Sequence, residues 1–172
     1  MIDFGQGVTL GPVNSFHGET MRAWRNDVRV RSWCRQVGVI SDTEQIRWMN
    51  GLGTDPAIRM FSVVDPVGTF VGVAGLTSID LVNSRAEFSL YIAPSEQGRG
   101  LGKHALKTLC LFGFEELGLN SIWGESFDGN PAIKIFTDVG FVKEGVRRDF
   151  YFKGGVFVDA VLVSIQRHEL KL

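Results

Sequence analysis

The sequence predicts a single α+β domain, residues 1–172, in which a mostly antiparallel sheet is flanked by helices. Two observations predict this class. Turn sequences join alternating apolar stretches in both halves of the chain, at residues 65–68 and at Gly154-Gly155, and tight turns of this kind connect antiparallel strands. Between these turns, apolar residues recur at helical spacing, so helices are expected to connect the two antiparallel parts. No linker interrupts the chain, whose length is sufficient for one core.

Local motifs place the individual elements. Ser41 and Glu44 form a capping box at the start of a helix. Asn130 followed by Pro131 is another typical helix start, because Asn caps free amides and proline is tolerated at the first helical position. Strands are expected at residues 2–13, 57–64, 69–77, 86–92, 121–127, 141–153 and 156–165. Helices are expected at residues 15–27, from residue 41 to near Gly51 or Gly53, from the glycines near residue 100 to near Gly118, and from Asn130 onwards.

Composition argues against several classes of function. The net charge of −1 provides no overall field that would favour nucleic acid or an anionic membrane, so neither is expected as a partner. No apolar run approaches about 18 residues, and no basic segment followed by an apolar one opens the chain, so a cytoplasmic location is expected. The two cysteines, Cys34 and Cys110, lack the spacing of metal ligands, and no metal is expected.

One loop combines the features of an anion-binding site. The strand expected at residues 86–92 leads into glycines at positions 98, 100 and 102, and a helical stripe follows at once. Glycines let the backbone approach a ligand closely, because no Cβ intervenes. The amides of a first helical turn have no partner in the helix and carry the positive end of its dipole. The arrangement therefore predicts a diphosphate-binding loop.

The spacing of this loop separates it from two other phosphate-binding motifs. A P-loop needs a glycine where Gln97 stands and Ser or Thr where His104 stands. The dinucleotide-binding fingerprint needs its third glycine at the position of Lys103. The remaining pattern is Gln97-x-x-Gly100-x-Gly102.

This pattern, with Pro94 three residues ahead of it, resembles the acetyl-CoA motif of the GNAT superfamily of N-acetyltransferases. Gly140-Phe141, which precedes the long final hairpin, resembles the closing segment of the ribosomal-protein N-terminal (alanine/serine) acetyltransferase branch. The resemblance is tight over residues 70–163 and loose over residues 1–60, where members of the superfamily bind different acceptors. It implies an acetyl-CoA-dependent N-acetyltransferase whose sheet is splayed at the acetyl-CoA site.

The resemblance also implies how acetyl-CoA would be held. Backbone amides of residues 98–103 would bind the pyrophosphate, and Arg99 and Lys103 would add positive charge. The main chain of residues 90–92 would pair with the pantetheine arm as an added strand, and Asn130 would touch that arm besides capping its helix. The implied acetyl-CoA-binding residues are Leu90, Tyr91, Ile92, Gln97, Gly98, Arg99, Gly100, Leu101, Gly102, Lys103 and Asn130.

Two carboxylates are candidates for the general base that takes a proton from the amine. Glu87 alternates with Phe88 on its strand and resembles the Glu that often starts this strand in the family. Glu125 lies five residues before Asn130, a position at which the ribosomal branch often carries a base candidate. Either side chain could instead be a surface residue of a strand, so the sequence leaves both roles open.

The proton donor for the leaving thiolate is not where the resemblance implies it. Many relatives carry Tyr four residues before the Gly-Phe pair, but this chain has Phe136, which has no proton to give. The segment from Asn130 to Gly140 is also about one residue shorter than the usual pattern. Tyr91 and Tyr151 match no motif position, and solvent could protonate a thiolate directly.

The first third of the chain mixes tryptophan with arginine, as in residues 24–35. Such a mixture is typical of an aromatic core beneath a basic surface, or of an acceptor pocket whose guanidinium groups hold phosphate or carboxylate. The expected acceptor is a primary amine on a protein N-terminus, a sugar or another small molecule. The alternatives are an enzyme specific for amines of nucleotide-linked sugars, to which Trp24-Arg25-Asn26-Asp27 is similar, and a non-catalytic acyl-CoA-sensing module. A homodimer through the final hairpin is a further expectation.

Overall fold

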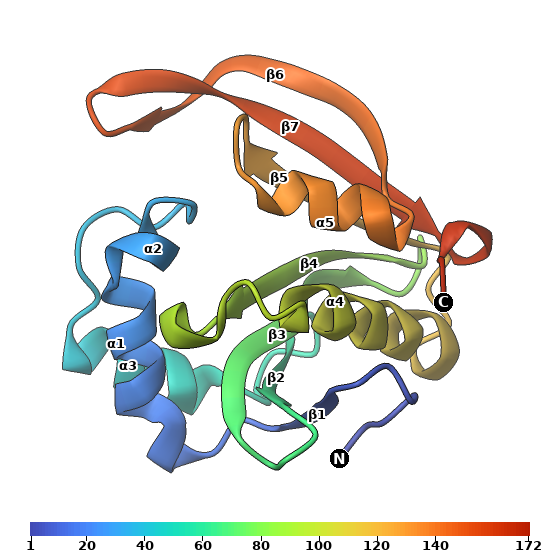
Figure 1. The fold of residues 1–172 in the computed structure, drawn as a ribbon, viewed down its shortest axis with the longest axis horizontal. Coiled ribbons are helices and arrows are strands. Elements are labelled where there is room, and N and C mark those ends of the chain that lie inside the picture. The colour runs from blue at the N-terminus through green and yellow to red at the C-terminus, as the bar shows by residue number, and fades with distance from the viewer.

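The structure, a computed structural model, describes residues 1–172 and contains one seven-stranded sheet with helices packed around it (Figure 1). The strand order is β1-β2-β3-β4-β5-β7-β6, and every neighbouring pair is antiparallel except β4 and β5. The predicted sheet, mostly antiparallel, is therefore confirmed. The strands are β1 (Thr9–Pro12), β2 (Arg59–Val64), β3 (Phe70–Asp80), β4 (Arg85–Ile92), β5 (Ser121–Phe127), β6 (Val142–Lys153) and β7 (Val156–Gln166).

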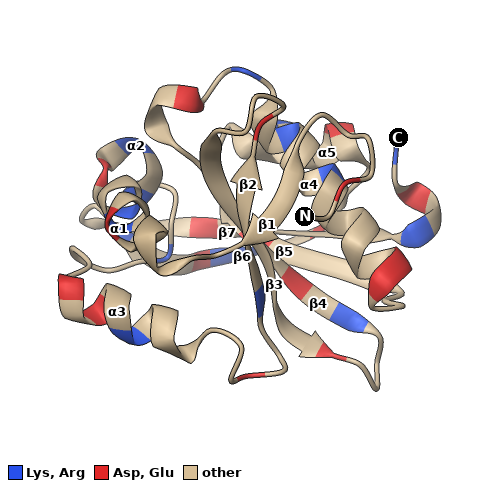
Figure 2. Cartoon of the chain, turned by 90° about the horizontal axis from the view of Figure 1, so that it is seen from below, with Lys and Arg blue, Asp and Glu red and all other residues tan.

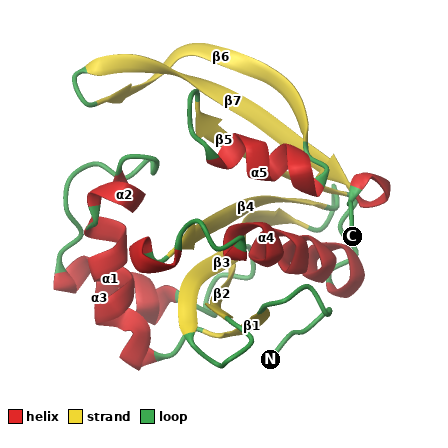
Figure 3. Cartoon of the chain, in the orientation of Figure 1, coloured by secondary structure: helices red, strands yellow, loops and turns green.

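Five α-helices and several short turns complete the fold. Figure 3 shows α4 and α5 beside one another against the central strands, while the first three helices gather at one end of the molecule. The tip of the β6–β7 hairpin reaches toward that same end (Figure 1). The helices are α1 (Gly18–Asn26), α2 (Val28–Arg31), α3 (Asp42–Gly51), α4 (Leu101–Leu111) and α5 (Ala132–Val139). A π-helical turn, Phe112–Glu116, continues α4, and 3-10 turns lie at Ser15–His17, Pro94–Glu96 and Arg167–Glu169.

The sheet is splayed at its one parallel junction. Strands β4 and β5 pair only where both begin, with Glu87 opposite Trp123 as the last pair. Beyond Glu87, β4 stays paired with β3 as far as Ile92, whereas β5 stays paired with β7. One edge of the second half of β4 therefore has no strand partner, which confirms the expected splay.

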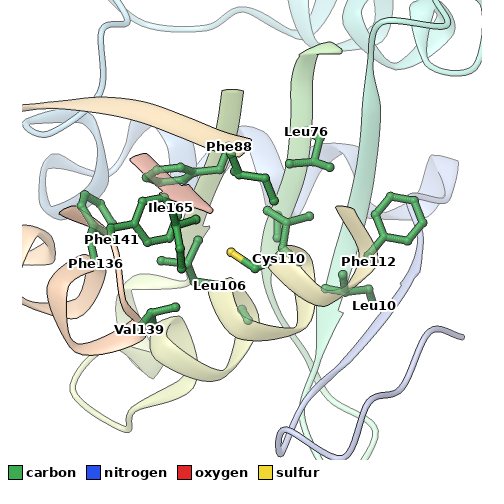
Figure 4. Packing of buried hydrophobic residues seen from close by; sticks show 14 of the residues in the cluster. Leu10, Leu76, Phe88, Leu106, Cys110, Phe112, Phe136, Val139, Phe141 and Ile165 are labelled. Carbon is green, nitrogen blue, oxygen red and sulfur yellow. The ribbon is translucent and has the colours of Figure 1, made fainter. Parts of the chain in front are cut away.

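The hydrophobic core lies between the sheet and helices α4 and α5. The predicted apolar stripe of α4 is buried, and Leu106, Leu109 and Cys110 are fully inaccessible to solvent. Figure 4 shows Leu106 and Cys110 packed within this core. Burial of each leucine side chain contributes on the order of 1.5–3 kcal/mol. On the α5 side, Phe136 and Phe141 pack edge-on against Phe88 with ring centroids 5.0 and 5.1 Å away. This packing fixes α4 and α5 beside the splayed strands.

The first 31 residues differ from the sequence-based expectation. The first strand is only β1, with an isolated bridge between Ile2 and Leu10, because Gly5 and Gly7 have φ of 70° and 84° and interrupt the extended backbone. The first helix opens with a 3-10 turn and ends at Asn26. The short helix α2 was not expected; it begins after Asp27, whose carboxylate accepts the Arg29 amide as an N-cap.

Helix α5 begins one residue later than expected. Its first residue is Ala132, not Pro131, and the Asn130 Oδ1 atom accepts the Ala132 amide at 2.9 Å. The capping interaction predicted for Asn130 is thus present although the boundary has moved. The turn at Gly154-Gly155 is confirmed: both residues have positive φ, 61° and 88°, as a two-residue hairpin turn requires.

Charged residues are distributed without a dominant sign. Figure 2 shows basic and acidic positions interspersed along the chain, in keeping with the net charge of −1. None of the helices has the length and apolarity needed to cross a membrane. No group of three or more His, Cys, Asp or Glu residues is placed to hold a metal ion.

Candidate active site

A cavity of about 660 Å³ lies where β4 and β5 separate. Its walls come from α2 and the loop that follows it, the second half of β4, the glycine loop, the ends of β5 and β6, and the start of α5. Most of the predicted site residues line it: Glu87, Leu90, Tyr91, Ile92, Gln97, Gly98, Gly100, Leu101, Gly102, Glu125 and Asn130. Residues between Glu87 and Asn130 are thus gathered around one space by the splay of the sheet, together with lining residues from Arg25 to Tyr151.

The glycine loop presents a row of free donors to this cavity. Gly98 and Gly100 have φ of 82° and 79°, a conformation that favours glycine, and they turn the chain into α4. The backbone amides of residues 98–102 make no hydrogen bond within the protein, whereas those of Lys103 and His104 donate to the Gly100 carbonyl. Free amides at a helix start favour an anion, because the helix dipole adds to their partial positive charge.

The conformation of the loop explains two of its three glycines. A Cβ at Gly98 would meet nothing within 4 Å, so positive φ and not crowding requires glycine there. At Gly102 a Cβ would make only ordinary contacts, 3.6 Å from Ile92 and 3.9 Å from Ile135. Gln97 anchors the loop by donating from Nε2 to the Ile92 carbonyl at 3.3 Å.

The two basic side chains of the loop lie outside the lining of the cavity. Arg99 forms an ion pair with Glu96 and approaches the buried carboxylate of Asp65 at 4.0 Å. Lys103 is half-buried on the first turn of α4 and has no ion-pair partner. Their expected contact with phosphate stays a prediction.

The open edge of β4 forms a second wall. Leu90, Tyr91 and Ile92 pair with β3 on one side and face the cavity on the other. The Arg25 guanidinium lies 5.5 Å from the centre of the Tyr91 ring, and burial raises the pKa of the Tyr91 hydroxyl above its ordinary value. Unpaired main-chain groups on a strand edge suit an extended ligand that hydrogen-bonds as an added strand.

Asn130 uses both ends of its amide within the protein. Its Oδ1 atom caps α5, and its Nδ2 atom donates to the Ser126 hydroxyl at 2.8 Å. The side chain nevertheless lines the cavity. Its structural role is visible, and its expected contact with the pantetheine arm stays a prediction.

Glu87 and Glu125 meet at the other end of the cavity. Their side chains are only 10% and 5% exposed, so neither is a surface strand residue. One guanidinium joins them: Arg35 Nη2 lies 2.6 Å from Glu87 Oε1, and Arg35 Nη1 lies 3.1 Å from Glu125 Oε1. Adjacent buried carboxylates would repel one another, and the shared arginine offsets that repulsion.

Two residues of β6 complete this cluster. Arg147 Nη1 lies 3.1 Å from Glu125 Oε2, and the Tyr151 hydroxyl donates to Glu125 Oε1. Burial raises the pKa of Tyr151 above its ordinary value of 10.0, and the hydrogen bond to Glu125 raises it further. The tyrosine therefore keeps its proton at neutral pH. Phe136, by contrast, is buried against Phe88 and supplies no hydroxyl.

Sequence reasoning did not assign roles to Arg35, Arg147 and Tyr151. The pairing of β6 with β7 is irregular between Arg147 and Tyr151, and Asp149 has a φ of 50° within this bulge. A bulge changes the direction of nearby side chains, and here both ends of it reach Glu125. No pattern in the sequence marks such a bulge. The run of arginines and tryptophans in residues 24–35 was the only sign that pointed toward Arg35.

A splayed sheet, an open strand edge and a row of free amides are the features of an α+β protein with a cleft for an extended anionic ligand. The family model described as an acetyltransferase (GNAT) domain matches residues 8–142. Among relatives, the uncharacterized N-acetyltransferase p20 of Bacillus licheniformis is 30% identical, over 73% of this chain and 72% of its own length.

Two further relatives carry more specific names. YdaF of Bacillus subtilis, which is named as a ribosomal N-acetyltransferase, is 32% identical over 59% of this chain and 56% of its own length. The solved structure of spermidine N-acetyltransferase from Vibrio cholerae, in complex with CoA and spermine, superposes with a TM-score of 0.90 at 25% identity. That match covers 96% of this chain and 98% of the Vibrio chain.

The protein belongs to the GNAT acetyltransferases. It is an acetyl-CoA-dependent N-acetyltransferase, and the resemblance drawn from the glycine motif is confirmed.

Proposed function

We propose that the protein transfers the acetyl group of acetyl-CoA to a primary amine by direct attack in the cavity between β4 and β5. The observation that carries the proposal is the row of five unpartnered amides at residues 98–102, which is suited to the pyrophosphate of CoA. The pantetheine arm would then follow the open edge of β4 at Leu90, Tyr91 and Ile92. This route leads from the glycine loop toward the cluster of Glu87 and Glu125.

Glu87 is the better candidate for the general base. Both oxygens of Glu125 are occupied: Oε1 accepts from Tyr151 and Arg35, and Oε2 accepts from Arg147. Glu87 receives one hydrogen bond, from Arg35 to Oε1, so its Oε2 is free to accept a proton from the amine, directly or through a water molecule. Glu125 then serves to hold Arg35 and Tyr151 in place.

Direct attack is favoured over an acyl-enzyme route. Cys110 is fully buried in the core, and burial raises the pKa of its thiol. Cys34 lines the cavity, but no histidine does, so no neighbouring base would activate that thiol. The amine nitrogen therefore attacks the thioester carbon, the carbon–sulfur bond breaks, and the CoA thiolate takes a proton from solvent, since Phe136 has none to give.

The proposed diphosphate-binding role of the glycine loop is tested by Gly100→Glu. A carboxylate carried by the middle residue of the amide row would repel the diphosphate and occupy its space, so calorimetry should show the affinity for CoA falling by roughly 100-fold or more. The matched control is Gly53→Glu. Gly53 has nearly the same positive φ, 81° against 79°, and open space around it, but it follows α3 outside the cavity. Equal affinity for CoA in the two variants would rule out the loop as the diphosphate site.

The acceptor is proposed here only as a primary amine. The Vibrio relative binds spermine and YdaF is named for ribosomal substrates, so the family includes small and macromolecular acceptors. A thiol-release assay over a panel of α-amines, sugar amines and polyamines would rank them. Tight CoA binding without turnover on any amine would favour the alternative of an acyl-CoA-sensing module. Cytoplasmic location and a homodimer remain parts of the proposal.

A further inference from the structure

The segment that carries Arg35 is held in position from two directions. Lys153 of β6 donates from Nζ to the carbonyl oxygens of Cys34 at 2.7 Å and Gln36 at 2.9 Å, the residues on either side of Arg35. On the α1 side, the Gln36 side chain donates to Asn26 Oδ1 and accepts from Arg25 Nε. These contacts fix the main chain on both sides of Arg35, whose guanidinium, although its side chain is 52% exposed, ends on two buried carboxylates.

This bridge leaves no carboxylate in the cavity without a guanidinium partner, although Glu87 Oε2 itself accepts no hydrogen bond. Three glutamates line it, and each already faces a guanidinium: Glu87 and Glu125 face Arg35, and Glu96 faces Arg99. Arg147 adds a second positive charge at Glu125. A second ammonium group on the acceptor would find no unpaired negative charge here and would lose its hydration on entering.

The charged side chains without a carboxylate partner in the cavity and beside it are positive. Arg25 lines the cavity above Tyr91 and has no carboxylate partner; its Nε donates to the neutral amide of Gln36. Lys153 likewise binds only carbonyl oxygens and lies 5.8 Å from the centre of the Phe127 ring. The remaining lining arginine, Arg29, is paired with Asp27. An acceptor that carries a phosphate or carboxylate would find a free guanidinium in Arg25.

We propose that Arg35 is a specificity-determining residue: by occupying Glu87 and Glu125 together, it excludes polyamines and leaves the site selective for a monoamine that carries an anionic group, which Arg25 binds. The inference rests on the proposed function, because it concerns the acceptor of the same reaction. It predicts that removal of the Arg35 charge exposes two buried carboxylates and creates a site for a cationic amine.

The first experiment is a calorimetric titration of the full chain with spermidine, with and without CoA. Wild type should bind spermidine weakly, and Arg35→Gln should bind it at least about tenfold more tightly, because charge-assisted hydrogen bonds to the two carboxylates become available. Arg148→Gln is the matched control. Arg148 is exposed on the same strand as Arg147, has no hydrogen-bond or ion-pair partner, and does not line the cavity. Its removal should leave the affinity for spermidine unchanged.

A second variant distinguishes the effect of the Arg35 charge on spermidine affinity from the effect of moving the loop that carries Arg35. Lys153→Met releases the carbonyls of Cys34 and Gln36 but keeps Arg35, so its affinity for spermidine should rise less than that of Arg35→Gln. The proposal is overturned if Arg35→Gln binds spermidine within twofold of wild type, or if wild type already binds it as tightly as the variant.

The second experiment addresses the anionic group. Wild type should bind phosphoethanolamine at least about tenfold more tightly than ethanolamine, and Arg25→Gln should reduce that ratio to near one. Equal affinity of wild type for the two amines would overturn this half of the proposal. CoA is titrated separately into every variant. If wild type did not bind CoA, the proposed function would be refuted. The affinities of wild type and Arg35→Gln for spermidine, measured without CoA, would still decide the role of Arg35.

Discussion

At the scale of single residues, the site depends on which hydrogen-bond donors contact the two carboxylates. Glu87 and Glu125 occupy similar buried positions on adjacent strands, yet one has a free oxygen and the other has none. The difference comes from β6, which contributes Arg147 and Tyr151 to Glu125 alone. Two residues of the same type therefore have different chemistry available to them.

The pair is distinguished by Glu87→Gln and Glu125→Gln. Glu87→Gln should lower kcat/KM by roughly 100-fold with little change in Tm, and should flatten the acidic limb of the pH–rate profile, because the amine loses its proton acceptor. Glu125→Gln should keep that limb but lower the free energy of unfolding by about 1–3 kcal/mol, because it leaves Arg147 and Tyr151 with a weaker partner. If both pH profiles match wild type, neither residue is the base.

At the scale of elements, the start of α5 serves both the fold and the site. Asn130 caps the helix through Oδ1 and fixes the end of β5 through its bond to Ser126. The same residue faces the cavity, so a loss of activity on its replacement would not by itself reveal a role toward the ligand.

The two roles of Asn130 are separated by Asn130→Ala and Asn130→Asp. Asn130→Ala should cost about 1 kcal/mol of stability through loss of the cap, whereas Asn130→Asp keeps an acceptor for the Ala132 amide and should stay near wild type in Tm. Asp cannot donate to a pantetheine carbonyl, however. Weaker CoA binding in Asn130→Asp at unchanged stability would support the contact with the arm; unchanged affinity in both variants would leave Asn130 a structural cap.

At the scale of the whole molecule, the hairpin of β6 and β7 is part of the site and also exposes an apolar surface. Tyr151 lines the cavity and donates to Glu125, and Lys153 donates to the carbonyls of Cys34 and Gln36 beside it. Toward its tip, Phe152 and Phe157 are each 64% exposed, and Phe150 and Val156 lie nearby and are also exposed. The rings of Phe152 and Phe157 lie 5.2 Å apart on paired strands, and exposed apolar side chains in contact are typical of an interaction surface.

A homodimer through this hairpin should be visible by analytical ultracentrifugation at micromolar concentration. Phe157→Ser should shift the protein to the monomer, because it removes apolar area from the centre of the patch. Val67→Ser changes a residue that is 84% exposed in the turn between β2 and β3 and should leave the dimer intact. A wild-type protein that sediments as a monomer would rule out this interface.

The sequence by itself determined the parts of the protein that rest on local rules. Glycines at 98 and 100 are required by positive φ, the capping box at Ser41 by free amides, and the final turn by the twist of a two-residue hairpin. The fold class and a diphosphate-binding loop could be predicted because short-range geometry specifies them, whereas acetyl-CoA as the ligand was implied by the resemblance to the GNAT superfamily.

The tertiary structure alone decided how the cluster around Glu87 and Glu125 is built. Arg35, Glu87, Glu125, Arg147 and Tyr151 come from four separate segments, and only the splay of the sheet and a bulge in β6 bring them together. No local pattern records which carboxylate has its oxygens filled or which arginine has no partner. These are long-range electrostatic contacts, whose distances are set by the packing of the whole chain.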